Sequence, residues 1–212
     1  MKILYEDNHL LVVNKEFNIL VQADKTGDKT LLDYYKEYIK KKYNKKGNVF
    51  LAPVHRLDRP AGGIIILART SKAAARLSSQ FREKKIIKIY NAIIEGRLIK
   101  KSGYVDKEIK NGSKKYEEKL EYKVIEEKKN YSLVEINLIT GKKHQIRRFF
   151  SEIKHPIAGD LRFGATKPLA DKSIALLAKK VVFYHPVKKE KISLEIELPA
   201  KYPWSIFCNK NY

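Results

Sequence analysis

The chain has 212 residues, of which 43% are hydrophobic and 33% are charged, a composition typical of a globular protein with a highly charged surface. A chain of this length forms one large domain or two small ones, and it buries enough surface to fold without disulfides or structural metals. Its 45 lysines and arginines exceed its 24 aspartates and glutamates and give a net charge of +21. This excess favours a polyanionic partner, most often a nucleic acid.

The single cysteine, Cys208, excludes an intramolecular disulfide and a cysteine-based metal site, and it is typical of a reducing compartment. The N-terminus carries acidic residues where a signal peptide needs an apolar run. No apolar run approaches the roughly 20 residues that a membrane helix requires. We therefore expect a cytoplasmic protein with no membrane segment.

The first third of the chain predicts two short strands and a helix. Residues 3–6 and 10–14 are expected to be strands joined by a turn at Asp7-Asn8. Thr30 is placed to cap a helix over residues 31–43. The lysines at 40–42 and 45–46 are interpreted as a solvated face and not as a specific site, although such a run can add non-specific affinity for phosphate.

Residues 55–70 combine a charged turn with an apolar strand. Pro60 and the following glycines favour a turn before the strand at 63–68, and they hold Asp58 at its entrance between Arg56 and Arg59. A carboxylate flanked by arginines stays ionised, which suits a nucleophile better than a general acid. A structural ion pair at the strand entry explains the same pattern equally well.

The middle of the chain predicts a helix and three strands. Thr70 or Ser71 caps a helix that runs to about residue 83. Alternation in a strand over 86–95 places Lys88 and Tyr90 on the same side, where Tyr90 alone would be interpreted as a core residue. Residues 96–119 are expected to be loops with a short strand near 105–109, followed by antiparallel strands at 120–126 and 132–138.

The last third predicts a helix that opens at residues 140–147 and three more strands. Arg147 lies beside the apolar stripe of this helix and can reach inward, and a buried arginine requires an acidic partner. The later strands are expected at 174–178, 181–184 and 192–198, and Trp204 and Phe207 are expected to pack back onto the domain. The irregular order of elements predicts a single α+β domain over residues 1–212, with a mixed, largely antiparallel sheet flanked by helices.

Read in order, several of these segments resemble the RluA family of RNA pseudouridine synthases. They are residues 3–15, 55–59 with 63–68, 88–92, 140–147, 155–160 and 183–186. The chain departs from the family pattern at Glu16, Ala61-Gly62, Lys142 and Leu177, which leaves the acid, the tyrosine and the helix arginine in place. The first residues already match the catalytic-domain hairpin, so no separate S4-like RNA-binding domain is expected.

The resemblance implies conversion of uridine in RNA to pseudouridine, with no cofactor and no metal. Asp58 matches the nucleophile, Tyr90 the residue that stacks on the uracil and serves as candidate general base, and Arg147 the cation that pairs with Asp58. A covalent step at a carboxylate divides one difficult displacement into two easier ones. Attack on the ribose, attack on the base and elimination to a glycal all remain compatible with these residues. A stacked uridine must also be flipped out of the RNA.

Basic side chains near this site are candidates for contacts with the RNA. The candidates are Arg56, Arg59, Lys88, His144 and Arg148. The arginines and Lys88 are equally well explained as solubilising charges, and His144 as a residue that hydrogen-bonds within its own turn. The expected partner is a single-stranded loop of ribosomal or transfer RNA, bound by a monomer. His55 and His144 lack a third ligand at a recognisable spacing, so no metal site is expected.

Two other functions compete with this interpretation. An RNA-binding protein or RNA chaperone without catalysis explains the charge but not the combination of Asp58, Tyr90 and Arg147. A hydrolase of a glycosidic bond needs a second catalytic carboxylate, for which Glu95 and Asp160 are available without supporting context.

Overall fold

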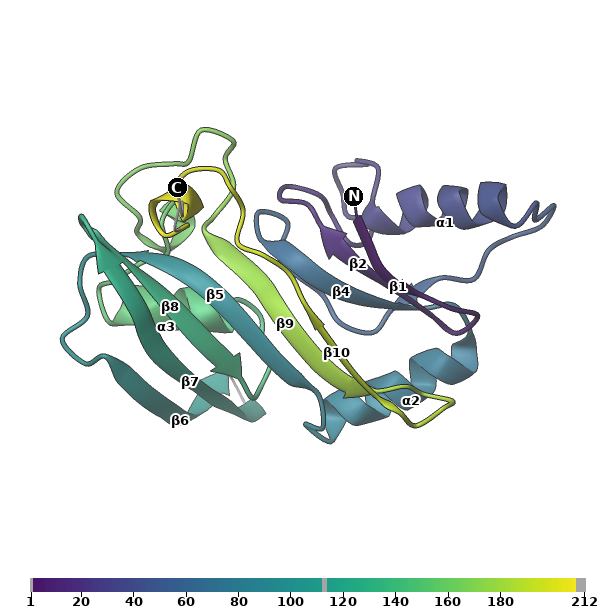
Figure 1. Cartoon of the computed structure of the whole chain (residues 1–212). Coiled ribbons are helices and arrows are strands. Elements are labelled where there is room, and N and C mark those ends of the chain that lie inside the picture. The colour runs from purple at the N-terminus through teal and green to yellow at the C-terminus, as the bar shows by residue number, and fades with distance from the viewer. Residues whose placement is uncertain (1, 112–113, 209–212) are drawn as a thin grey trace. The chain divides into compact units, whose positions relative to one another are not determined.

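The computed structural model describes residues 2–111 and 114–208, and these form two compact units (Figure 1). Unit 1 contains the described residues within Met1–Ile86 and Val181–Ile196, and unit 2 those within Ile87–Lys180 and Glu197–Tyr212. The assignment of all 212 residues to a single catalytic domain stays a prediction.

Unit 1 is built around the buried strand β4 (Gly62–Ala68). On one side β4 pairs antiparallel with β2 (Leu10–Lys15), with Leu10 opposite Ala68 and Lys15 opposite Gly63. β2 in turn pairs with β1 (Lys2–Glu6), and the two-residue β3 (Ala52–Pro53) also pairs with β4. Apolar side chains of β2 and β4 are almost completely buried and form the core of this unit.

Both helices of unit 1 begin at a threonine cap, as predicted. Thr30 caps α1 (Leu31–Lys42) in a capping box with Asp33, and Thr70 caps α2 (Ser71–Arg82) by accepting a hydrogen bond from the backbone of Ala73. Caps of this kind satisfy backbone N–H groups that have no partner within the helix.

Unit 2 contains an antiparallel run of four strands and the helix α3 (Gln145–Glu152). The strands are β5 (Ile87–Glu95), β8 (Tyr131–Leu138), β7 (Lys114–Lys128) and β6 (Ser102–Asn111), in that spatial order. Two 3-10 turns, Leu161–Phe163 and Trp204–Ile206, complete the unit, and Trp204 is fully buried as predicted.

Strand β9 (Leu176–Tyr184) contributes residues to both units, and β10 (Lys191–Glu195) pairs with it. The described part of the chain thus forms a mixed, largely antiparallel sheet of ten strands with three α-helices, which confirms the predicted α+β class. Among the described residues, no helix combines the length and the apolar character that crossing a membrane requires.

The short strand predicted near residues 105–109 lies within β6, but the loops predicted around it were wrong beyond residue 101, because β6 and the 15-residue β7 occupy most of this stretch. The period-two pattern was hidden because charged residues occupy inward-facing positions: Glu118 is buried and Lys107 is half-buried, whereas their neighbour Glu117 is exposed. The residues between the two strands, 112–113, lie outside the described part of the chain.

Two smaller predictions were also corrected. The strands expected at 174–178 and 181–184 form one continuous strand, β9, because Lys179 and Lys180 lie half-buried within it instead of interrupting it. The third helix begins at Gln145 and not at Thr140, since His144 adopts a left-handed conformation, with φ of 57°, directly before it.

Candidate active site

Asp58 lies, partly buried, on a tight turn that leads into β4. The backbone carbonyl of Asp58 accepts a hydrogen bond of 3.1 Å from the amide of Ala61, and Leu57 beside it is buried. The glycines that follow are needed for this path: a Cβ on Gly62 would lie 2.8 Å from the ring of Phe17, and Gly63 has φ of 117°. The predicted turn at the entrance of a core strand is therefore confirmed.

A buried lysine that the sequence interpretation overlooked fastens this turn. Lys15, only 1% exposed, donates hydrogen bonds to the carbonyls of Glu16 (3.0 Å), Ile19 (2.8 Å) and Arg59 (3.1 Å). Burial lowers the pKa of Lys15 to about 7, and the Asp58 carboxylate opposes that shift. Three carbonyls match the three N–H groups of an ammonium, so Lys15 joins β2 to the segment that carries Asp58. Its only signal in the sequence is a cation at the end of a strand that begins with four apolar residues.

Arg59 and His55, on either side of Asp58, have structural partners within unit 1. The Arg59 guanidinium lies 2.7 Å from the Asp28 carboxylate and donates to the carbonyl of Asn18, whereas Arg56 is exposed. His55 Nε2 accepts a hydrogen bond of 3.0 Å from the amide of Ile66, and its ring stacks near Phe81. His55 thus supports β4, and contacts of Arg56 and Arg59 with RNA stay predictions.

In unit 2, the acidic partner that an inward-facing Arg147 requires is Asp160. Arg147 Nε and Nη2 donate to the two carboxylate oxygens of Asp160 at 2.6 and 2.8 Å, and both side chains are buried. The Phe163 ring covers the guanidinium at 4.7 Å. The predicted pair of Arg147 with Asp58 stays a prediction.

Asp160 reaches Arg147 through a turn that depends on Gly159. Gly159 has φ of 87°, and a Cβ there would lie 2.7 Å from the carbonyl oxygen of Ser173. The turn is closed by a hydrogen bond of 3.0 Å from the Asp160 amide to the Ile157 carbonyl. The sequence showed the Gly-Asp turn but not the residue that its carboxylate binds.

Tyr90 and Lys88 lie two residues apart on β5, and therefore on the same side of the strand, as predicted. Tyr90 is 7% exposed and pairs across the sheet with Ile136 of β8. Burial lowers the pKa of Lys88 to about 8, and its ammonium donates a hydrogen bond of 3.4 Å to the carbonyl of Ile139.

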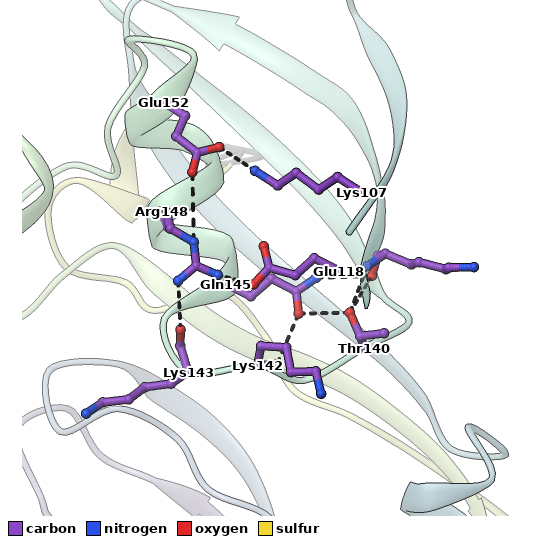
Figure 2. A network of polar contacts seen from close by, with 9 residues as sticks. Lys107, Glu118, Thr140, Lys142, Lys143, Gln145, Arg148 and Glu152 are labelled. Carbon is purple, nitrogen blue, oxygen red and sulfur yellow. Dashed lines mark hydrogen bonds and ion pairs between the residues drawn. The ribbon is translucent and has the colours of Figure 1, made fainter. Parts of the chain in front are cut away.

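Arg148 takes part in a network between α3 and the hairpin of β6 and β7 (Figure 2). Its guanidinium binds the carboxylate of Glu118, donates to the carbonyl of Lys143 at 3.3 Å and lies 3.8 Å from Glu152. Lys107 of β6 binds the other oxygen of Glu152. The guanidinium that was expected to contact RNA is thus engaged in an intramolecular network, and its contact with RNA stays a prediction.

The same network holds the loop before α3. Gln145 Oε1 accepts hydrogen bonds from the Thr140 hydroxyl (2.9 Å) and the Lys142 amide (3.0 Å), as Figure 2 shows. His144 ends this loop with its ring edge-on to Phe163, 5.5 Å between centroids. Both ends of the loop at 140–144 are therefore tied to β7 or α3, while the side chains of Lys142 and Lys143 are exposed.

The three predicted catalytic residues are divided between the two units. Unit 1 offers a carboxylate on a fixed turn, and unit 2 offers a tyrosine and an arginine held by buried partners. Within residues 2–111 and 114–208, no group of three or more His, Cys, Asp or Glu side chains is arranged to hold a metal ion.

The model of one protein family, RNA pseudouridylate synthase, matches residues 9–152. The chain belongs to this family. Among relatives, an uncharacterized RNA pseudouridine synthase of Bacillus subtilis (strain 168) is 32% identical over 213 residues, which cover 94% of this chain and 69% of the relative. As predicted, the chain is an RNA pseudouridine synthase of the RluA type.

Two further relatives of this pseudouridine synthase have named classes of substrate. The ribosomal large subunit pseudouridine synthase D of Zymomonas mobilis is 31% identical, with 94% of this chain and 69% of the relative covered. The tRNA pseudouridine synthase C of Haemophilus ducreyi is 29% identical, with coverage of 99% and 95%. A solved structure, human RNA pseudouridylate synthase domain containing 4, has the same fold, with a TM-score of 0.80, 24% identity and coverage of 97% and 91%.

Proposed function

We propose that this synthase isomerises uridines in a loop of ribosomal or transfer RNA, with Asp58 as the nucleophile. The observation that carries the assignment is the position of Asp58 on a turn that Lys15 fastens to the core strand β2. A nucleophile must be held in one geometry to gain from proximity, and a buried ammonium bound to the adjacent carbonyl supplies that rigidity.

In this proposal Tyr90 stacks on the flipped uracil and is the candidate general base, and Arg147 pairs with the Asp58 carboxylate. The support for Arg147 is that Asp160 fixes its guanidinium from one side. The uracil detaches from the ribose, turns and reattaches through carbon 5, so the product has the same atoms as the substrate. Flipping the base costs a few kcal/mol, and this cost is lowest in a single-stranded loop.

The proposed substrate rests on the relatives and on the net charge. The names of the relatives point to ribosomal RNA of the large subunit and to transfer RNA, and we favour the former. A net charge of +21 is suited to an RNA phosphate backbone. The monomeric state, the cytoplasmic location and the independence of metals remain part of the proposal.

The first test is the substitution Asp58→Asn, which keeps the shape of the side chain and removes its charge. We expect pseudouridine formation on total RNA to fall below detection, while the affinity for RNA and the melting temperature stay close to those of the wild type. The matched control is Asp28→Asn, which removes the carboxylate bound to Arg59 at an exposed site and leaves Asp58 in place. Activity should survive in this control.

Appreciable turnover by Asp58→Asn would reject Asp58 as the nucleophile. If instead the wild-type protein bound RNA tightly but formed no pseudouridine in any RNA tested, the interpretation as a binding module would replace the proposed activity.

A further inference from the structure

The C-terminal end of α1 carries four exposed lysines, Lys40, Lys41, Lys45 and Lys46, which we call the α1 basic end. Figure 1 shows α1 and the loop that follows it. On sequence alone such a run is interpreted as a solvated face. The structure adds three observations that favour a binding surface.

First, these lysines are carried by an ordered helix cap. Asn44 adopts the left-handed conformation, with φ of 48°, and its amide donates to the carbonyl of Lys41. The amide of Lys45 donates to the carbonyl of Lys40 at 3.1 Å. This pair of bonds is the Schellman motif, which closes a helix and fixes the backbone on both sides of the turn.

Second, the charge of the α1 basic end is not neutralised. In the part of the chain that the structure describes, no carboxylate forms an ion pair with any of its four lysines. Their neighbour Lys42 differs, because it binds Glu6 at 2.7 Å. The partial negative charge at a helix C-terminus amounts to about half a unit, so it does not balance four ammonium groups.

The hairpin of β6 and β7 provides the contrast. Four lysines in this hairpin or just before it each have a carboxylate partner: Lys101 with Glu127, Lys115 with Glu108, Lys119 with Asp106, and Lys128 with Glu126. A lysine-rich composition alone would give both regions the same character. Of these two sets of lysines, the α1 basic end is therefore the one whose positive charge has no carboxylate partner among the described residues.

Third, an aromatic ring with a fixed orientation lies among the lysines. Tyr43 is 41% exposed, its hydroxyl donates to Glu6 at 2.8 Å, and the Arg69 guanidinium lies 4.7 Å from its ring centroid. Basic side chains beside an exposed aromatic ring are typical of surfaces that follow a nucleic-acid strand.

We propose that the α1 basic end binds the phosphate backbone of the substrate RNA outside the target nucleotide. This proposal rests on the proposed function, because its ligand is the RNA on which the enzyme acts. A lipid surface fits less well, since the apolar residues Leu31, Tyr35 and Ile39 of α1 are buried inside unit 1 and are not available for insertion.

The test compares two variants that each lose four positive charges. One replaces Lys40, Lys41, Lys45 and Lys46 with Gln, and the other replaces Lys101, Lys115, Lys119 and Lys128 with Gln. The dissociation constant for a substrate RNA is measured as a function of salt, together with kcat and KM. Each lysine that contacts a phosphate contributes about 0.7 to 0.9 to the slope of log K against log salt. The α1 variant should therefore lose about three units of slope and show a raised KM with an unchanged kcat, whereas the hairpin variant should lose less than about one unit.

Equal slopes in the two variants would overturn the proposal, because net charge and not position would then govern binding. The proposal would also be overturned if the α1 variant had the same salt slope as the wild type. It would be overturned as well if the α1 variant lost binding to anionic lipid vesicles while its affinity for RNA stayed unchanged. Equal melting temperatures of the variants and the wild type would exclude unfolding as the cause. If the wild-type protein bound RNA without forming pseudouridine, the proposed function would be refuted. The salt slopes of the two variants would still test the α1 basic end, because they measure binding and not catalysis.

Discussion

Arg147 and Asp160 form a buried ion pair with two hydrogen bonds, which changes what a substitution of Arg147 reports. The requirement for an acidic partner followed from the sequence, and Asp160 satisfies it within unit 2. A loss of stability on removing Arg147 is therefore expected from this pair alone, and it carries no information on whether Arg147 also meets Asp58.

The first prediction at this scale is that Arg147→Ala lowers the free energy of unfolding by about 3–5 kcal/mol, because it leaves the Asp160 charge buried without its partner. The double variant Arg147→Ala with Asp160→Asn should recover part of this loss, since no buried charge is then stranded. Urea denaturation measures both. Arg162→Ala is the control, since Arg162 is exposed beside the same Phe163 ring, and it should change stability by less than about 0.5 kcal/mol.

A stability of Arg147→Ala equal to that of the wild type would contradict the buried pair. A separate cycle with Asp58→Asn isolates the proposed catalytic contact: Arg147 and Asp58 are coupled if the effects of the two substitutions on stability are not additive.

At the scale of elements, the contact between β7 and α3 depends on one inward-facing carboxylate. Glu118 is 1% exposed and binds Arg148, which in turn holds the carbonyl of Lys143. Gln145 accepts hydrogen bonds from Thr140 and from the Lys142 amide in the same loop. The loop and the first turn of α3 are thus positioned by the hairpin, although Arg148 was expected to serve the RNA directly.

The expected effect of Glu118→Gln is a loss of about 1–3 kcal/mol in stability, because a neutral amide replaces the charged acceptor of a buried hydrogen bond. Amide exchange in the loop at 140–144 should become faster, and kcat should fall more than KM rises. The matched control is Glu117→Gln, one residue away on the exposed face of the same strand, where the carboxylate lies 3.4 Å from Lys119. Equal effects of the two substitutions on exchange would show that Glu118 does not position the loop.

At the scale of the whole molecule, the net charge of +21 is unevenly distributed. Four lysines in or just before the β6–β7 hairpin are paired with carboxylates, whereas within the described residues those of the α1 basic end are not. The total charge therefore identifies the class of partner, and the distribution of ion pairs identifies where that partner is expected to bind.

The prediction at this scale concerns the cellular substrate. Pseudouridine mapping of total RNA should show that cells without this gene lose one or a few loop positions, in large-subunit ribosomal RNA or in transfer RNA. The wild-type gene should restore these positions and the Asp58→Asn gene should not. An unchanged map in cells known to express the protein would contradict the proposed substrates.

The sequence by itself was sufficient for the features that depend on neighbouring residues. The threonine caps of α1 and α2, the strands at 10–14 and 63–68 and the glycine turn after Asp58 all follow from local dihedral preferences and hydrophobic periodicity. The order of the motifs was sufficient to predict the family, and the family implies both the α+β class and the enzyme class.

Tertiary structure alone decided which charges are buried and what they bind. The strands predicted at 105–109 and 120–126 lie within the β6–β7 hairpin, but its full extent escaped prediction because Glu118 and Lys107 face inward, and a strand with inward charges does not alternate between apolar and polar residues. Lys15 and Asp160 were also missed as partners, because each binds a residue of another segment. A buried charge is tolerated only when it has a partner, and here another segment supplies that partner: Arg148 for Glu118, and the Arg59 carbonyl for Lys15. No local sequence pattern shows which distant segments the chain brings together.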